Sequence, residues 1–364
     1  MMRLPPPPPN DPQQIALGWL EFHLREAGVL GDADVIDLAA KGLGESVGFL
    51  SRMARITPRY SRDTASSPAS LIIKLETNDT KLRDIADRLH AFDREIGFYR
   101  DLAPEAPTRL PRVYASGVDG DVHWLLFEDL GRLKPGDQVR GLSNRQVEMT
   151  LRHIGAVHAA NWEDSALAGH AWLPEHDFYF RGDFREAWPL FRENYELRMG
   201  REATALFERL LDRQDRLDEE LSGRPCTLVH GDLRADNLML GVEGTEEEVL
   251  ILDWQTATRS VAAIDVALLV GGSEPPPERA GHYHGLFSGW LDTLRSHGVE
   301  GYTEAEAGRD FRLGLLSCMR IPLQAFEALG GPDFPTPRAA QLADVLSLRH
   351  TSAAIEMDAG DVLP

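Results

Sequence analysis

The densest chemical signal in the chain reads Leu228-Val229-His230-Gly231-Asp232-Leu233-Arg234-Ala235-Asp236-Asn237-Leu238-Met239-Leu240, and Val249-Leu250-Ile251-Leu252-Asp253-Trp254-Gln255 follows it closely. Short apolar runs typical of β-strands flank a polar loop in the first stretch. A further apolar run, in the second stretch, ends in the carboxylate of Asp253. The pattern predicts strand ends that bring Asp232, Asn237 and Asp253 together.

These residue types are the parts that phosphoryl transfer requires. One carboxylate orients the attacking hydroxyl and accepts its proton, while an amide oxygen and a second carboxylate hold Mg²⁺ on the phosphates. Asp232 precedes Asn237 by five residues, which is the offset of the corresponding Asp and Asn in the protein-kinase catalytic loop. The alternative is that these side chains only cap turns between strands, a common use of Asp, Asn and His.

His230-Gly231-Asp232 with Asn237, and Asp253-Trp254-Gln255, resemble the motifs of the aminoglycoside phosphotransferase and choline kinase group of small-molecule kinases, most closely its ecdysteroid-kinase-like branch. The resemblance implies an α+β, protein-kinase-like bilobal fold with a small antiparallel-sheet N-lobe and a larger, mainly helical C-lobe. It also implies that Asp232 is the catalytic base and that Asn237 and Asp253 bind Mg²⁺. ATP would donate its γ-phosphoryl group to a small-molecule hydroxyl.

The remaining pattern is consistent with two lobes. We expect a proline-rich leader over residues 1–10, an N-lobe with a nucleotide-binding sheet and helix over 11–130, and a C-lobe with the catalytic loop, the metal site and helical substrate-binding insertions over 131–364. The N-lobe prediction consists of a helix that starts near Pro12, strand-like runs within 35–75, one long helix over 78–102, and strands over 112–117 and 122–128. C-lobe helices are predicted over residues 143–162, 184–199, 202–221, 278–296, 304–329 and 338–357.

Lys74 lies inside an apolar run, Leu71-Ile72-Ile73-Lys74-Leu75. A buried charge is costly unless it is paired, and Glu95 lies on the helix predicted to follow. The resemblance implies that Lys74 is the catalytic lysine that contacts the α- and β-phosphates and that Glu95 orients it. From the residues alone, Lys74 could instead face solvent from an edge strand, and Asp93 or Glu105 could replace Glu95.

Lys41-Gly42-Leu43-Gly44-Glu45-Ser46-Val47-Gly48 precedes that strand and predicts a loop over the nucleotide. Gly42 and Gly44 permit close backbone approach to phosphate, and Ser46 adds a hydroxyl donor. An ordinary hairpin turn is the alternative. A dinucleotide-binding site is disfavoured because no apolar strand leads into Gly42 and no long helix follows.

At the predicted hinge between the lobes, Glu128 and Leu130 are expected to form hydrogen bonds with adenine through their backbones. A plain strand end explains these two residues nearly as well.

Charge and composition restrict the partners. The 364 residues carry a net charge of −20, which disfavours nucleic acid. Cys226 and Cys318 lie far apart without a C-x-x-C motif, so the spacing indicates neither a disulfide framework nor a zinc site. The sequence shows no signal peptide and no membrane-spanning apolar stretch. We therefore predict a cytoplasmic protein without membrane insertion, and the oligomeric state stays open.

The acceptor is the least determined part of the prediction. Aromatic residues concentrate between residues 171 and 195, where relatives build the acceptor pocket. Core packing is the preferred interpretation for most of these rings, although aromatic walls also bind cations and apolar rings. Asp177, Asp183 and Glu186 would suit an amino sugar or amino alcohol, or they form a solvated face. The ecdysteroid-kinase-like branch implies a sterol-like alcohol.

Some positions have structural interpretations, and two other functions remain open. By resemblance, Asp265 braces the catalytic loop, and His158 and Trp162 pack in the core; the role of Arg234 is open. The rival functions are a non-catalytic nucleotide-binding pseudokinase scaffold and a kinase acting on protein side chains.

Overall fold

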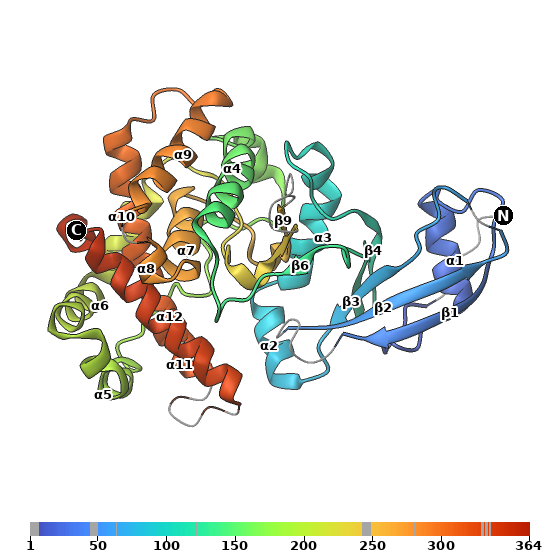
Figure 1. Ribbon diagram of the computed structural model, residues 1–364, viewed down its shortest axis with the longest axis horizontal. Coiled ribbons are helices and arrows are strands. Elements are labelled where there is room, and N and C mark those ends of the chain that lie inside the picture. The colour runs from blue at the N-terminus through green and yellow to red at the C-terminus, as the bar shows by residue number, and fades with distance from the viewer. Residues whose placement is uncertain are drawn as a thin grey trace. The chain divides into compact units, whose positions relative to one another are not determined.

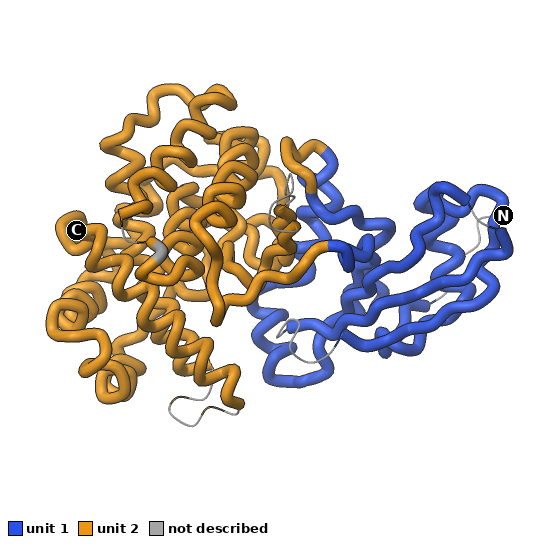
Figure 2. Tube along the Cα trace, in the orientation of Figure 1, with its two compact units in different colours: residues 1–104, 110–132 blue, residues 105–109, 133–364 orange. Residues whose placement is uncertain are grey.

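The structure is a computed structural model (Figure 1). It describes residues 7–43, 50–62, 64–120, 122–241, 249–279, 281–328, 331, 334 and 336–364. The chain divides into two compact units, residues 1–104 with 110–132, and residues 105–109 with 133–364 (Figure 2). The first unit is built on an antiparallel sheet and the second is mainly helical, which confirms the predicted fold class.

The sheet of the first unit has five antiparallel strands in the order β1-β2-β3-β5-β4. The strands are β1 (Val35–Gly42), β2 (Ser51–Tyr60), β3 (Leu71–Glu76), β4 (Val113–Asp119) and β5 (Val122–Glu128). Every residue of β3 is buried, because β3 is the middle strand and its apolar sequence suits a strand covered on both faces. Helix α1 (Leu17–Glu26) buries Trp19, Leu20 and Leu24. These side chains belong to the same hydrophobic core as the buried side chains of the sheet.

Two helix predictions in this unit are wrong in their bounds. Asp11 closes a turn instead of starting a helix, because its carboxylate accepts from the Gln13 N–H at 2.9 Å, and helix α1 begins only at Leu17. The helix predicted over 78–102 is two helices, α2 (Thr80–Arg88) and α3 (Ala91–Asp101). His90 separates them with a left-handed backbone, φ 48°. Such a conformation is uncommon outside glycine, and no Gly or Pro near His90 indicates the break.

The second unit contains most of the helices and two small sheets. Its helices are α4 (Asn144–Ala160), α5 (Trp188–Met199), α6 (Arg201–Ser222), α7 (Ala263–Ser273), α8 (Pro276–Arg279), α9 (Tyr283–Ser296), α10 (Glu304–Cys318), α11 (Arg320–Ala328) and α12 (Pro337–Glu356). The strands are β6 (Lys134–Pro135), β7 (Thr227–Val229), β8 (Leu238–Leu240), β9 (Val249–Ile251) and β10 (Thr258–Ser260). The predicted helices over 278–296 and 304–329 are each divided in two.

Short 3₁₀ turns connect several of these elements. They are η1 (Ala103–Glu105), η2 (Ser165–Gly169), η3 (Ala235–Asn237), η4 (Trp254–Thr256) and η5 (Ala359–Val362). Strand β7 pairs with β10, and β8 lies between β6 and β9. The turns η3 and η4 therefore lie beside the two small sheets, within the stretch that carries the predicted chemistry.

Helix α7 is buried along its whole length and packs against α10 and α12. Its sequence is apolar on all sides apart from Asp265 and its last residue, which is typical of a helix enclosed by others. A carboxylate inside such a helix needs hydrogen-bond donors from the protein. For Asp265 these donors lie in the loop that follows β7.

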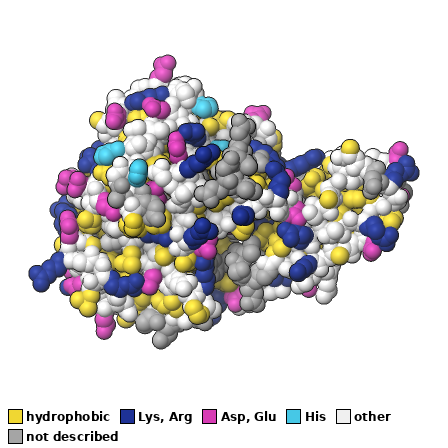
Figure 3. All heavy atoms as spheres, viewed as in Figure 1, with side chains coloured by type: hydrophobic (Ala, Val, Ile, Leu, Met, Phe, Trp, Pro, Cys, Tyr) yellow, Lys and Arg dark blue, Asp and Glu magenta, His cyan; other side chains and the backbone are white. Residues whose placement is uncertain are grey.

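On the face of the molecule seen in Figure 3, the Asp and Glu side chains are not concentrated in one patch. Acidic and basic side chains are interspersed there. Within the part of the chain that the structure describes, we find no helix with the length and apolar character needed to cross a membrane.

Candidate functional site

The loop that follows β7 is held by the buried carboxylate of Asp265. The N–H groups of His230 and Gly231 donate to its two oxygens at 2.7 and 2.9 Å. His158 Nε2 lies 3.2 Å from the same carboxylate. Because Trp290 Nε1 donates to the other ring nitrogen of His158, Nε2 carries the proton toward Asp265. The predicted bracing role of Asp265 and the core position of His158 are confirmed.

His230 connects this loop to the end of β9. Its Nε2 lies 2.8 Å from the Leu252 carbonyl, and its Nδ1 lies 3.2 Å from the Asp232 N–H. A carbonyl only accepts and an N–H only donates, so the ring is neutral with its proton on Nε2. The ring is fully buried, and its centroid lies 4.8 Å from that of Trp254. His230 therefore positions the loop and has no ring nitrogen left for acid or base chemistry.

Gly231 is the loop position that requires glycine. Its φ is +81°, and a Cβ there would lie 2.5 Å from the Thr256 carbonyl oxygen. The Thr256 hydroxyl also donates to the His230 carbonyl at 2.9 Å. Any side chain would force the loop away from η4.

Three side chains hold the carboxylate of Asp232. The Tyr179 hydroxyl donates to Oδ1 at 2.9 Å, while Arg234 Nε and Asn237 Nδ2 donate to Oδ2 at 3.1 and 2.9 Å. The Asp232 side chain is still 18% exposed. A carboxylate offers roughly four acceptor positions. Asp232 is therefore fixed in orientation and keeps capacity for one further donor, such as the hydroxyl of an acceptor.

Strands β8 and β9 bring Asn237 and Asp253 to the same end of their sheet. Leu238 pairs with Ile251, and the Leu252 N–H donates to the Asn237 carbonyl at 2.9 Å. Asn237 Nδ2 donates to Asp232, so its Oδ1 is the atom that can bind a cation. Asp253 follows Leu252 directly, with a left-handed backbone at φ 64°. Carboxylate and amide oxygens are the donors that Mg²⁺ prefers, so the residues present fit this ion.

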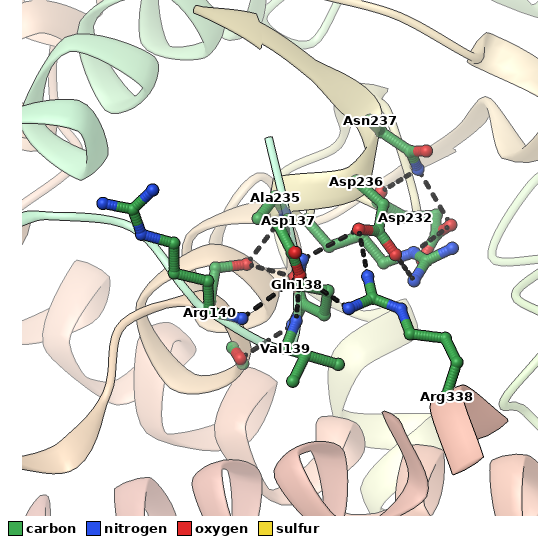
Figure 4. A network of polar contacts seen from close by, with 12 residues as sticks. Asp137, Gln138, Val139, Arg140, Asp232, Ala235, Asp236, Asn237 and Arg338 are labelled. Carbon is green, nitrogen blue, oxygen red and sulfur yellow. Dashed lines mark hydrogen bonds and ion pairs between the residues drawn. The ribbon is translucent and has the colours of Figure 1, made fainter. Parts of the chain in front are cut away.

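The outer side of the loop is tied to the segment after β6 and to α12 (Figure 4). Asp236 accepts from the Gln138 N–H at 2.8 Å, and Gln138 Oε1 accepts from the Ala235 N–H at 2.9 Å. Arg338 Nη2, on α12, lies 3.6 Å from Asp236 Oδ1. Arg234 donates to both Asp232 and Asp236. Part of its role, which the sequence left open, is therefore to hold these two carboxylates within the loop. Burial lowers the pKa of Arg234, but the two carboxylates raise it by more.

The first unit contains a buried ion pair between β3 and α3. Lys74 Nζ lies 2.9 and 2.7 Å from the two oxygens of Glu95, and the side chains are 5% and 1% exposed. The ammonium also lies 5.8 Å from the centroid of the Phe92 ring. Because β3 is the middle strand, the alternative of Lys74 on an edge strand is wrong. Glu95, rather than Asp93 or Glu105, is the carboxylate of the pair.

The predicted glycine loop lies only partly within the described residues. Gly42 is the last residue of β1. Gly44 and Ser46 lie outside the described residues. The part of the loop proposed to cover phosphate therefore stays a prediction.

The predicted hinge follows β5. The Glu128 N–H donates to the Arg112 carbonyl at 2.9 Å, so an adenine contact from Glu128 would have to use its carbonyl oxygen. Between the two hinge residues, Asp129 forms an ion pair with Arg55 of β2 at 2.6 Å. Leu130 is buried. The segment is anchored to the sheet, and its adenine-binding role stays a prediction.

A second charged cluster in the first unit centres on His123 of β5. This ring contacts the buried carboxylate of Glu76 on β3, and its Nε2 lies 3.3 Å from Asp93 on α3. The hydrogen bond with Glu76 is the largest cause that raises the pKa of His123, and burial partly opposes it. His123 on β5 thus contacts both β3 and α3, the two elements that carry Lys74 and Glu95.

We expect His123→Gln to lower the free energy of unfolding more at about pH 6 than at about pH 9. The pKa of His123 is raised on folding, so its stabilising contribution is fully present below the unfolded value of about 6.5 and is lost as the pH rises through the folded value. Urea unfolding of both proteins at both pH values measures this difference. An equal loss at the two pH values would show that the ring acts by packing alone.

The aromatic segment of the second unit is mostly core. Its buried rings are Phe178, Phe180, Phe184, Phe191 and Tyr195, which confirms the preferred interpretation. Tyr179 differs, because its hydroxyl donates to Asp232. Burial first, and then the charge of Asp232, raise the pKa of Tyr179 well above its ordinary value, so the hydroxyl stays protonated. Sequence reasoning missed this contact, because aromatic density does not distinguish one ring from its neighbours.

Comparisons with known proteins add independent information. Residues 58–302, more than half of the chain, match the phosphotransferase enzyme family. The structure of a microcompartment-associated aminopropanol kinase is similar with a TM-score of 0.56 and 15% identity, over 95% of this chain and 99% of that one. A macrolide 2′-phosphotransferase from Brachybacterium faecium gives a TM-score of 0.51 and 18% identity, over 88% and 98%. These likenesses confirm the kinase-like fold. No curated protein sequence matches the chain.

Proposed function

Because this chain belongs to the phosphotransferase enzyme family, we propose that it transfers the γ-phosphoryl group of ATP, with Mg²⁺, to a hydroxyl group of a small molecule. One observation carries the proposal. Asp232, Asn237 and the backbone of Asp253 meet at the ends of β8 and β9, and the Asp232 carboxylate is both fixed and partly exposed.

Asp232 is the base in this proposal. Its carboxylate orients the acceptor hydroxyl and takes the hydroxyl proton as the oxygen attacks the γ-phosphorus. Tyr179, Arg234 and Asn237 hold the carboxylate in one orientation, so little reorganisation is needed when the acceptor binds.

Asn237 and Asp253 are the proposed metal ligands, through the amide oxygen and the carboxylate. When bound, Mg²⁺ offsets the negative charge on the β- and γ-phosphoryl oxygens. Lys74, held by Glu95 at 2.7 Å, is proposed to contact the α- and β-phosphates. Gly42, Gly44 and Ser46 complete the proposed phosphate loop, and the backbones of Glu128 and Leu130 are proposed to receive the adenine.

The acceptor is proposed to be an amino sugar, an amino alcohol or a sterol-like alcohol. The similar structures include, by their names, an aminopropanol kinase and a macrolide phosphotransferase, so this fold handles both small amino alcohols and large rings. Asp183, one acidic candidate for a cationic acceptor, is exposed and pairs with Arg185 at 2.7 Å. The hydrogen bonds from Arg185 hold the pKa of Asp183 below its ordinary value. This pairing weakens the case for Asp183 as a cation site.

The ecdysteroid-kinase-like branch and a cytoplasmic location remain predictions. A pseudokinase scaffold is disfavoured because Lys74, Asp232, Asn237 and Asp253 supply each residue type that the chemistry requires.

Transfer of γ-phosphate from labelled ATP to a panel of amino sugars, amino alcohols and sterols tests the function. We expect label in one acceptor class, dependent on Mg²⁺, and a parallel series with labelled GTP determines the donor. Nucleotide binding without transfer to any alcohol would favour the scaffold. Label found only on added protein would favour a protein kinase.

A further inference from the structure

We propose that Glu175, His176 and Cys226 form a binding site for one Zn²⁺ ion. The three residues lie in the second unit, outside the set of side chains assigned to phosphoryl transfer. Cys226 precedes β7, and Glu175 and His176 lie in the aromatic segment. The sequence spacing did not indicate a zinc site, because about fifty residues separate the thiol from the other two ligands. The fold brings them together.

The ligand atoms converge. His176 Nε2 lies 3.7 Å from Cys226 Sγ and 3.9 Å from Glu175 Oε1, and all three atoms lie within 4.8 Å of one another. Donors bound tetrahedrally to Zn²⁺ at the usual bond lengths lie roughly 3.3–3.6 Å apart. The separations of His176 Nε2 from Cys226 Sγ and from Glu175 Oε1 therefore need to shorten by a few tenths of an ångström for both atoms to bind one ion. Glu175 is half exposed, so its carboxylate can move to complete the set.

The surroundings of the site orient the ligands. His176 Nδ1 lies 2.8 Å from the Ser260 hydroxyl. When Nδ1–H donates to this oxygen, Nε2 presents its lone pair toward Cys226 and Glu175, which is how metal-binding histidines are usually held. Glu175 Oε2 pairs with Arg259 at 3.1 Å. That bond leaves Oε1 as the oxygen directed at His176.

The backbone at the site is held in a costly conformation. His176 has a left-handed backbone with φ 51°. Its N–H donates to the Arg259 carbonyl, and the Arg259 N–H donates to the Pro174 carbonyl, both at 2.8 Å. Left-handed residues other than glycine persist only where their surroundings hold them, often at ligand sites. The contacts with β10 keep the imidazole in place before any ion arrives.

The donor set selects the metal. One thiolate, one imidazole and one carboxylate suit Zn²⁺, whereas Mg²⁺ prefers oxygen donors alone. On binding, Zn²⁺ replaces the thiol proton of Cys226, so a Zn–S bond forms as the S–H bond breaks and the proton passes to solvent. Three protein ligands leave the fourth tetrahedral position for water.

The site joins two segments that lead to Asp232. Cys226 immediately precedes β7, which continues into the Asp232 loop, and Tyr179 follows His176 by three residues and donates to Asp232. A Zn²⁺ ion bound by both Cys226 and His176 would therefore hold together the segment that leads through β7 to Asp232 and the segment that leads to Tyr179. The proposal itself rests on the ligand geometry and is independent of the phosphotransferase assignment.

Cobalt substitution of the full-length protein tests the site. With Mg²⁺ in excess to occupy oxygen-donor sites, Co²⁺ is added and the near-ultraviolet thiolate-to-cobalt charge-transfer band is recorded, followed by displacement with Zn²⁺. We expect one equivalent of Co²⁺ to produce the band and one equivalent of Zn²⁺ to abolish it. Zn²⁺ should also raise the melting temperature.

Matched variants identify the ligands. Cys226→Ser and His176→Gln should lose the band and the zinc-dependent rise in melting temperature, whereas Cys318→Ser, which removes the other cysteine, should retain both. Ser260→Ala should weaken zinc binding by about 10–100-fold, as loss of a supporting hydrogen bond does in other zinc sites. The melting temperature without metal shows that each variant is folded. A wild-type protein that produces no thiolate band, or a band that persists in Cys226→Ser, would overturn the proposal.

Discussion

Replacing Asp232 with asparagine is expected to lower kcat by at least about 10²–10⁴-fold, with a much smaller change in nucleotide affinity. The substitution replaces the carboxylate with an amide, which cannot take the proton from the acceptor hydroxyl as we propose for Asp232. It should leave the fold intact, because the new amide oxygen can still accept from Arg234 and Asn237. The amide nitrogen can donate to the Tyr179 hydroxyl, which can turn to accept. Asp232→Ala would instead leave those donors without their acceptor.

Steady-state kinetics with the acceptor found in the panel, together with nucleotide titration, measure this effect. Tyr179→Phe is the matched control, because it removes one of the three hydrogen bonds to the Asp232 carboxylate and keeps the proposed base. We expect a smaller fall in kcat for that variant. Near-normal turnover by Asp232→Asn would remove Asp232 from the role of base, and the labelled-transfer panel would then still decide whether the chain is a kinase.

Lys74→Met is expected to destabilise the protein by about 3–5 kcal/mol and to abolish transfer. The substitution removes the ammonium from a buried ion pair whose carboxylate, Glu95, is 1% exposed, and removing one partner of a buried pair is strongly destabilising. In the double variant Lys74→Met/Glu95→Met, both charges are gone and the volume is nearly kept. We expect that variant to recover most of the stability and none of the activity, because the ammonium proposed for the phosphates is still missing.

Urea unfolding measures the loss of stability, and the rate of label transfer from ATP measures the loss of activity. Lys81→Met, at an exposed lysine near the start of α2, is the control for loss of a positive charge in the same unit, and it should change neither quantity appreciably. A double variant with wild-type activity would exclude Lys74 from nucleotide binding. A single variant as stable as the wild type would show that the Lys74–Glu95 pair is not the costly buried contact that its burial implies.

The candidate chemical residues stand out in the sequence because they lie in local patterns. Asp232 and Asn237 are five residues apart on one loop, and Asp253 ends a strand that the apolar run makes evident. Lys74 was predictable for a related reason, because a lysine inside a continuous apolar strand must find a partner. In each case a few neighbouring residues contain the signal.

The contacts that position those residues could not be predicted in the same way. The break at His90 depends on a left-handed backbone that no nearby glycine or proline indicates. The bridging role of Arg234 depends on Asp232 and Asp236, which face it only after the loop has folded around Gln138.

Read without coordinates, the amino-acid order indicates the fold class through the resemblance of its motifs, and it points to the candidate base, the candidate lysine and the candidate metal ligands, because motif spacing and strand periodicity are local properties. Folding alone decides that Tyr179 supports Asp232, that Glu95 rather than Asp93 holds Lys74, and that Cys226 meets His176. These contacts join residues about 20 to 53 positions apart. They exist because burying the apolar faces of strands and helices fixes where the attached polar side chains must find partners.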